Sequence, residues 1–163
     1  LLDSCQKFYR KIKTKRYWIA IAAVIAIFFF LDRWLKNLAL GLESGEKISI
    51  IKNVLNFHLV PNPYIAFSLP LSGQLLNIII SLLLLGITAY LLIYWRQEKT
   101  SPLAYSGWLM ILGGGLSNLC DRWRFSYVID YFDLYYFSIF NLADTLIFCG
   151  CLLVIINYWR QEK

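Results

Sequence analysis

Four apolar stretches alternate with polar segments along the chain. They cover residues 17–40, 75–95, 103–119 and 139–159. A helix that rises 1.5 Å per residue needs roughly 20 residues to cross the ~30 Å hydrocarbon layer of a membrane, a length that the third stretch only just approaches. The pattern predicts four transmembrane helices that form a single membrane domain over residues 1–163.

The polar segment at 41–72 has the character of strands instead of a helix. Residues 47–51 and 55–60 are β-branched or alternate in polarity, and Asn62-Pro63 and Leu69-Pro70 are turn signals. We expect a small sheet or cradle here. A second polar segment, 121–138, joins the third and fourth helices on the same side. The predicted fold is therefore an all-α membrane protein with four transmembrane helices and a small extracytoplasmic β cradle.

Composition supports a lipid environment. Hydrophobic residues make up 59% of the 163 residues, whereas soluble domains have about 45–50%. Charged residues make up 16%, whereas soluble domains have about 25%. This excludes a disordered chain and an ordinary soluble protein. The four cysteines lack the spacing of a zinc site or a disulfide framework, and His58 is the only histidine. We therefore expect neither a metal nor a cofactor, and we interpret His58 as an ordinary strand residue.

Charge is distributed unevenly between the two sides of the predicted bundle. One side holds ten of the sixteen basic residues and three of the ten acidic ones. These basic residues are Lys7, Arg10, Lys11, Lys13, Lys15, Arg16, Arg96, Lys99, Arg160 and Lys163. The positive-inside rule predicts that both termini are cytoplasmic, with segments 41–72 and 121–138 outside. Because the lysines flank a span, we attribute them to topology and expect no nucleic-acid partner.

The first apolar stretch has the basic start of a secretory signal peptide. It leads, however, into Asp32-Arg33-Trp34-Leu35-Lys36 and not into a small-residue cleavage site. We expect this segment to be retained as a helix.

Acidic residues gather towards the outer ends of the predicted helices, where each is a functional candidate because lipid does not tolerate charge. Asp32 and Lys36 are four residues apart on one helix, so a structural ion pair and a catalytic role are both open. Asp121 and Arg122, with Asn118 one turn earlier, end the third helix after three glycines. Adjacent Asp and Arg commonly form a buried structural pair, although a chemical role for Asp121 is also open.

Asn141 and Asp144 share one face at the start of the fourth helix. No cation on the same helix is within reach of Asp144, so its partly desolvated carboxyl can hold a proton. Asp130, in the preceding connection, is the natural partner, and two carboxyls that share a proton can activate water and protonate a leaving nitrogen. Spacing alone leaves Asp133 and Asp121 as alternative partners.

Together these segments resemble the signal peptidase II, or lipoprotein signal peptidase, family. The resemblance covers residues 17–159 and rests on five motifs in order: Asp32-Arg33-Trp34-Leu35-Lys36, Asn62-Pro63-Tyr64-Ile65-Ala66-Phe67, Gly113-Gly114-Gly115-Leu116-Ser117-Asn118-Leu119-Cys120-Asp121-Arg122, Val128-Ile129-Asp130-Tyr131 and Phe140-Asn141-Leu142-Ala143-Asp144. Two positions depart from the family pattern, since Tyr64 and Ser117 both replace glycine.

The resemblance implies an aspartyl endopeptidase of the bacterial inner membrane that removes signal peptides from prolipoproteins, cutting before a diacylglyceryl-modified cysteine. It also implies contact with membrane lipids and inhibition by globomycin-type cyclic peptides. The implied catalytic dyad is Asp130 and Asp144. The implied substrate-binding or supporting residues are Asn62, Asn118, Asp121, Arg122, Asn141, Asp32 and Lys36.

Two other functions fit buried carboxylates. A small proton- or ion-coupled transporter would need them, although it would favour mid-span positions and inverted repeats, neither of which this sequence has. The remaining alternative is a membrane scaffold without catalytic activity.

Overall fold

A computed structural model describes residues 2–43, 45–64, 72–94, 101–136 and 138–161, with side chains described from residue 16. Its elements are α1 (Leu2–Leu40), β1 (Ile48–Ile51), β2 (Leu55–Asn62), α2 (Gln74–Tyr94), α3 (Pro102–Phe125), β3 (Val128–Leu134), β4 (Ile139–Phe140) and α4 (Leu142–Gln161). The predicted turn at Leu69-Pro70, the cations Arg96, Lys99 and Lys163, and residues 65–67 of the second motif lie outside the described residues. The chain is mostly helical, with one small antiparallel sheet.

Among the described residues, three helices are long and apolar enough to cross a membrane: Arg16–Leu40, Gln74–Ile93 and Leu142–Gln161. The segment predicted as the third of four spans, now part of α3, is not among these candidates in the described part of the chain. It packs against α1, α2 and α4. A helix surrounded by other helices can carry glycine and polar residues because protein, not lipid, covers much of its surface.

Three predicted helix boundaries differ by three or more residues, the first being the start of α1 at Leu2 instead of 17. Helix α3 continues six residues past 119 and ends where Ser126 adopts a left-handed conformation, with φ 66°, and donates its N–H to Arg122 O. Asp121 and Arg122 therefore lie on α3, as expected from their place at the end of the third helix, and the connection predicted at 121–138 begins only after Phe125. Helix α4 begins at Leu142, later than the predicted 139, because Ile139 and Phe140 pair with β3.

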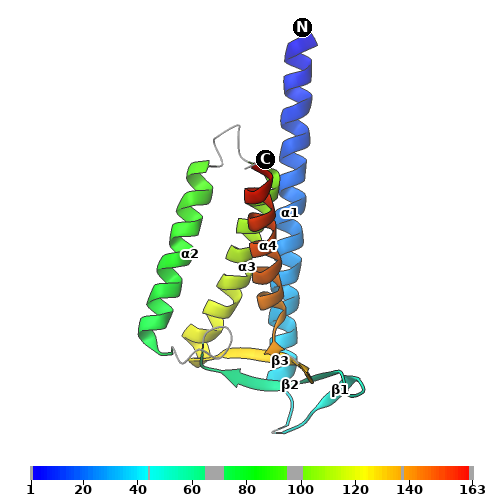
Figure 1. Ribbon diagram of the computed structural model, residues 1–163, viewed down its shortest axis with the longest axis vertical. Helices are drawn as coiled ribbons and strands as arrows, with labels where there is room; N and C mark the ends of the chain where they lie inside the picture. The colour runs from blue at the N-terminus through cyan, green and yellow to red at the C-terminus, as the bar shows by residue number, and fades with distance from the viewer. Residues whose placement is uncertain (1, 44, 65–71, 95–100, 137, 162–163) are drawn as a thin grey trace.

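The sheet has the order β1-β2-β3-β4, with every neighbouring pair antiparallel. It lies across one end of the helices, while the beginning of α1 and the end of α4 lie at the other (Figure 1). The strands predicted at 47–51 and 55–60 form β1 and β2, whereas β3 was not predicted as a strand. A bulge in β2 between Phe57 and Val60 places two residues opposite Tyr131.

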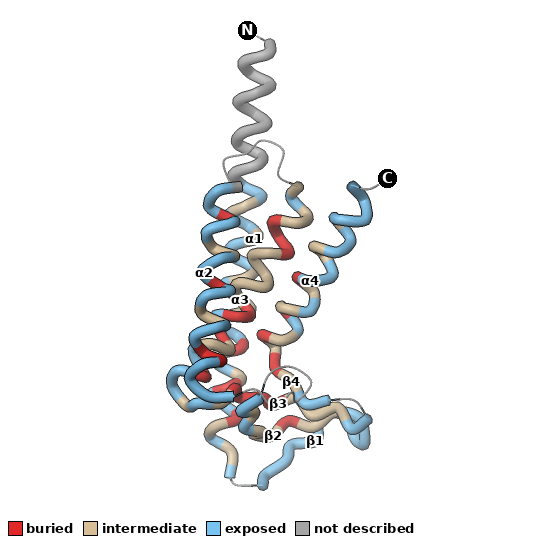
Figure 2. Tube along the Cα trace, turned by 60° about the vertical axis from the view of Figure 1, so that its left-hand side comes forward, coloured by how far each residue is buried: buried red, intermediate tan, exposed pale blue. Residues whose placement is uncertain are grey.

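A small core joins the sheet to the helices. Phe57, Ile129 and Tyr131 pack with Ala39 near the end of α1, and all four are buried. In Figure 2 many buried positions lie at the sheet end of the helices and others lie near the start of α3, whereas the outer faces of α2 and of the far half of α4 are exposed. The buried end of the bundle is thus the region that holds Asp130, the residue next to Ile129 and Tyr131.

Helices α3 and α4 approach each other closely at paired glycines. A Cβ built on Gly107 would lie 2.7 Å from Gly150 O, and one built on Gly150 would lie 2.6 Å from Gly107 O. Any side chain at either position would push the two helices apart. This contact anchors α4 against α3 and so helps to fix its first turn relative to Asn118.

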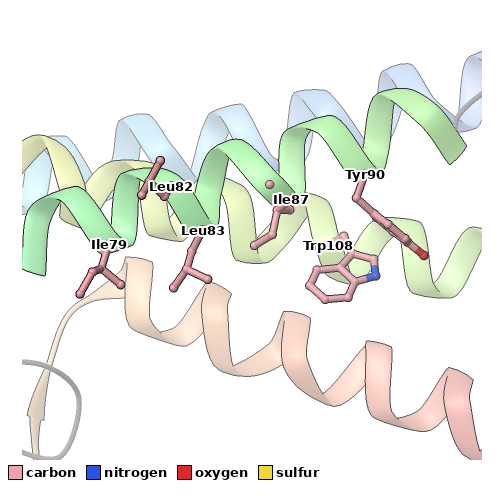
Figure 3. A pocket seen from close by; sticks show the side chains of 7 residues that line it. Ile79, Leu82, Leu83, Ile87, Tyr90 and Trp108 are labelled. Atoms are coloured by element: carbon pink, nitrogen blue, oxygen red, sulfur yellow. The ribbon is translucent and has the colours of Figure 1, made fainter.

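An open apolar groove runs along α2. It is lined by residues of α2 and by Trp108 of α3, and in Figure 3 Ile79 and Leu83 point towards α4. The full lining is Ile79, Leu82, Leu83, Gly86, Ile87, Tyr90 and Trp108. Almost no polar surface lines the groove, which makes it compatible with hydrocarbon or with an apolar peptide.

Candidate active site

Hydrogen bonds and ion pairs connect eight of the nine predicted site residues at the sheet end of the bundle. The connected residues are Asn62, Asp130, Asn141, Asp144, Asn118, Lys36, Asp32 and Asp121. They come from α1, β2, β3, α3 and α4 and from Asn141, which precedes α4. The fold therefore brings together residues more than one hundred positions apart in the chain.

Asp130 lies in the middle of β3 and is 2% exposed. Asn62 Nδ2, at the end of β2, donates to Asp130 Oδ2 over 2.8 Å, and Asn141 Nδ2 donates to Oδ1 over 2.7 Å. The antiparallel register, which pairs Val60 with Asp130, brings Asn62 to this carboxyl. Both oxygens are thus held by neutral amides.

Burial is the largest cause that raises the pKa of the Asp130 carboxyl, to about 7, and the negative charge of Asp144 adds to it. The two amide donors act in the opposite direction because they stabilise the ionised form. Asp130 can therefore exchange a proton near neutral pH, as a general acid or base requires.

Asp144 occupies the third position of α4 and forms a reciprocal cap with Asn141. Asn141 Oδ1 accepts the Asp144 N–H over 2.9 Å, and Asp144 Oδ2 accepts the Asn141 N–H over 3.2 Å. This is the capping-box arrangement, with Asn and Asp in place of Ser and Glu. The other oxygen, Oδ1, accepts Asn118 Nδ2 over 2.7 Å. Local capping chemistry therefore orients one carboxyl of the candidate dyad.

The first turn of α4 has an acceptor for each of its free N–H groups. Leu142 N–H donates to Tyr131 OH over 2.9 Å, and Ala143 N–H donates to Asp32 Oδ1 over 3.2 Å. With Asn141 accepting the next N–H, side chains from β3 and α1 complete the helix start. The position of Asp144 thus depends on two other elements.

A buried ionic cluster is linked to Asp144 through Asn118. Lys36 Nζ is 2.9 Å from Asp32 Oδ2 and 2.7 Å from Asp121 Oδ2, and all three side chains are fully buried. The i,i+4 ion pair between Asp32 and Lys36, one of the two roles left open by the sequence, is present. Asp32 also accepts hydrogen bonds from Ser117 Oγ at 2.6 Å and Tyr131 OH at 2.9 Å. Asp32 thus contacts α1, α3, β3 and α4.

The suggested pairing of Asp121 with Arg122 is not what the structure has. Asp121 pairs with Lys36 and with Arg33, whose Nη1 is 2.5 Å from Oδ1. Arg122 instead donates to Tyr64 O over 2.6 Å and to Pro63 O over 3.4 Å. Neighbouring helix residues point in directions about 100° apart, so the two side chains reach different parts of the molecule. Arg122 thereby holds the segment that follows β2.

Sequence reasoning missed three contributors to this region: Arg33, Ser117 and Tyr131. Arg33 stands inside the first-helix motif and its charge within a span was a usable signal. Tyr131 adjoins Asp130, but no sequence pattern shows that its hydroxyl reaches Asp32. At Tyr64, the backbone does not have the positive φ that a glycine would permit, so the loop accepts a side chain there.

The remaining acidic candidate, Asp133, lies apart from this network. Its Oδ2 is 3.0 Å from Nε2 of His58, which lies on β2, and 3.7 Å from Nζ of Lys47, which immediately precedes β1. It is three positions from Asp130 on the same strand, so the two side chains project to opposite faces. Among the described residues, no three His, Cys, Asp or Glu side chains are grouped to hold a metal.

Comparisons with known proteins agree on one family. The family model described as Signal peptidase (SPase) II matches residues 24–160. The lipoprotein signal peptidase of Halothermothrix orenii is 36% identical over 141 residues, 86% of this chain and 95% of that protein. The lipoprotein signal peptidase of Syntrophomonas wolfei is 36% identical over 152 residues, 91% of this chain and 98% of that protein.

Solved structures agree in fold. Two structures described as bacterial membrane enzymes superpose with TM-scores of 0.77 and 0.70, at 21% and 23% identity. The two matches cover 88% and 85% of this chain, and 90% and 92% of the respective matched chains. The matched family model, which spans most of the sequence, and the relatives at over 30% identity establish that the chain belongs to the signal peptidase II family.

Proposed function

We propose that this protein is an aspartic endopeptidase that removes signal peptides from prolipoproteins, cutting before the diacylglyceryl-modified cysteine, with Asp130 and Asp144 as its catalytic dyad. The observation that carries the proposal is the position of Asn141, which donates a hydrogen bond to each carboxyl. Among the described residues neither carboxyl forms an ion pair, so both are free for proton transfer.

The chemistry needs one proton shared by the dyad. One carboxylate takes a proton from a water molecule, whose oxygen attacks the scissile carbonyl carbon. The protonated partner polarises that carbonyl, and the pair then delivers a proton to the leaving nitrogen as the C–N bond breaks. The pKa of Asp130 near 7 supports this scheme, because the pair titrates as a unit and can hold a single proton at neutral pH.

The proposed membrane arrangement has four spans, with α3 as the third. Both termini would be cytoplasmic, and the sheet and dyad would lie on the extracytoplasmic side of the bacterial inner membrane. This is supported by the sheet and the two chain ends lying at opposite ends of the bundle (Figure 1) and by the excess of basic residues near the termini. Membrane lipids and globomycin-type peptides are the expected further ligands.

The apolar groove along α2 is the proposed path for the hydrophobic part of the signal peptide. Its lining extends from Ile79 to Tyr90 on α2, roughly 16 Å at 1.5 Å per residue, which suits a signal-peptide apolar region of 7–15 residues. In a variant without the native cysteines, Leu83→Cys labelled at its thiol with a photoreactive group should crosslink to a signal peptide, whereas Ile50→Cys in β1, labelled in the same way, should not. Equal crosslinking at both positions would contradict this path.

Substitution of the two aspartates tests the catalytic proposal. Asp130→Asn and Asp144→Asn should each abolish cleavage of a diacylglyceryl-modified prolipoprotein reporter by protein reconstituted in lipid. Asp133→Asn is the matched control, because it removes a carboxyl from the same strand outside the network. Full activity in either dyad variant would overturn the assignment, and loss only in Asp133→Asn would move the chemistry to that residue.

A further inference from the structure

The ammonium of Lys36 has a contact that its ion pairs do not account for. Lysine has three N–H donors and no acceptor. Two of them face Asp32 and Asp121, and Lys36 Nζ also donates to Asn118 Oδ1 over 2.8 Å. The side chain of Lys36 is fully buried, so water does not compete for any of these donors. One bond of this ammonium is therefore directed at a neutral amide.

That amide connects the ionic cluster to the dyad. While its oxygen accepts from Lys36, the nitrogen of Asn118 donates to Asp144 Oδ1 over 2.7 Å. An asparagine amide has one accepting and one donating end, and reversing it here would place N–H groups against the ammonium and an oxygen against the carboxylate. Because Lys36 can only donate, it fixes which end of Asn118 faces Asp144.

We propose that Lys36 is a positioning residue for the peptidase reaction: it orients the Asn118 amide so that this amide holds the Asp144 carboxyl in its reactive position. The inference rests on the proposed role of Asp144. Lys36 would act only through Asn118, without touching substrate. The remaining constraint on Asp144 is its reciprocal cap with Asn141, which fixes its other oxygen.

Arg33 is the matched control for this proposal. Arg33 and Lys36 are the two cations of the cluster, and both pair with Asp121. Arg33 donates to Ser117 O and Asp121 but not to Asn118. Lys36→Met and Arg33→Met each remove one positive charge, yet only Lys36→Met releases the Asn118 amide.

The test measures kcat and KM for a diacylglyceryl-modified prolipoprotein peptide with reconstituted enzyme. For Lys36→Met, kcat should fall by about 100-fold, the effect of misplacing a reacting group, with KM within about twofold of wild type. Arg33→Met should lower kcat far less than Lys36→Met does, because it leaves the Asn118 amide held by Lys36. Equal losses in both variants, or a retained kcat in Lys36→Met, would overturn the proposal.

A second variant covers the case in which Lys36→Met folds poorly because buried Asp32 loses its cation and Asp121 keeps only Arg33. The double variant Lys36→Met/Asp121→Asn restores the charge balance of the cluster. The midpoint temperature of thermal unfolding should therefore return towards the wild-type value, while kcat stays low. Recovery of kcat along with stability would show that Lys36 only neutralises charge, which contradicts positioning.

Measured beside these variants, Asp144→Asn separates the two proposals. If Asp144→Asn is inactive and Lys36→Met is fully active, only the positioning role fails. If Asp144→Asn is fully active, the proposed dyad fails and the role of Lys36 fails with it.

Discussion

Asn141 Nδ2 donates a hydrogen bond to Asp130 Oδ1 over 2.7 Å, so the residue that caps the start of α4 also holds the carboxyl in the middle of β3. The same residue caps α4 through Oδ1 and the Asp144 N–H. One side chain thus performs two tasks, helix capping and orientation of the proposed dyad, and substitutions can separate them.

Asn141→Ser should separate capping from dyad orientation. Serine is a good N-cap but is too short to replace the amide donated to Asp130, so stability should stay close to wild type while prolipoprotein cleavage falls. Asn141→Ala removes both functions and should also lose about 1 kcal/mol of stability. Reporter cleavage and thermal unfolding of both variants check this. Wild-type cleavage by Asn141→Ser would mean that the contact with Asp130 is dispensable.

Cleavage should depend on the raised pKa of Asp130. Activity that needs one proton on the dyad should fall as the pH rises above about 7, because that proton is then lost. Well above this pH the rate should fall about tenfold for each pH unit. Asn62→Ala removes a donor that stabilises the ionised form, so it should raise the pKa of Asp130 further and move the alkaline limit to higher pH. A pH–rate profile of both proteins measures the shift, and a lower alkaline limit in Asn62→Ala would contradict it.

Stability has the corresponding pH dependence. The pKa of Asp130 is higher in the folded protein than the ~3.9 of an unfolded aspartate, so folding favours the protonated form. The contribution of this group is fully present below pH of about 4 and is lost as pH rises through about 7. Asp130→Asn should flatten this part of the stability curve, which denaturation between pH 5 and 8 would measure.

Asp32→Asn should be strongly destabilising. Removing one charge of a buried ion pair costs about 3–5 kcal/mol, and Asp32 also accepts from Ser117 Oγ, Tyr131 OH and Ala143 N–H. Glu43→Gln, at an exposed position, is the control and should change stability by no more than about 0.5 kcal/mol. Chemical denaturation in lipid–detergent mixtures compares them. If Asp32→Asn and Glu43→Gln were equally stable, the contacts of Asp32 would not contribute to stability in this way.

Gly107→Ala should separate α3 from α4. The added Cβ would meet Gly150 O and Val154 Cγ2, and such overpacking costs about 1–3 kcal/mol. Gly86→Ala is the control, because nothing lies within 4 Å of a Cβ at that position and alanine is the better helix former by about 1 kcal/mol. The midpoint temperature of thermal unfolding should be lower than wild type for Gly107→Ala and equal to or higher than wild type for Gly86→Ala. The reverse order would contradict the close helix contact.

The sequence predicted the helices better than it predicted their ends. Apolar runs of span length identify α1, α2 and α4 directly, because lipid demands about 20 apolar residues whatever the neighbouring helices do. The extent of α3 and the pairing of Ile139 and Phe140 were missed. Both depend on long-range contacts, which a local pattern of apolar residues does not encode.

The sequence by itself determined which residues are chemically unusual: carboxyls and amides at the outer ends of apolar helices, where an unpaired polar group is costly. Only the tertiary structure decided their partners. Asp121 adjoins Arg122 in sequence but pairs with Lys36 and Arg33, and Asp130 rather than Asp133 meets Asn141. The reason is geometric, because the direction of each side chain is set by helix rotation and strand register, and contacts between elements fix both.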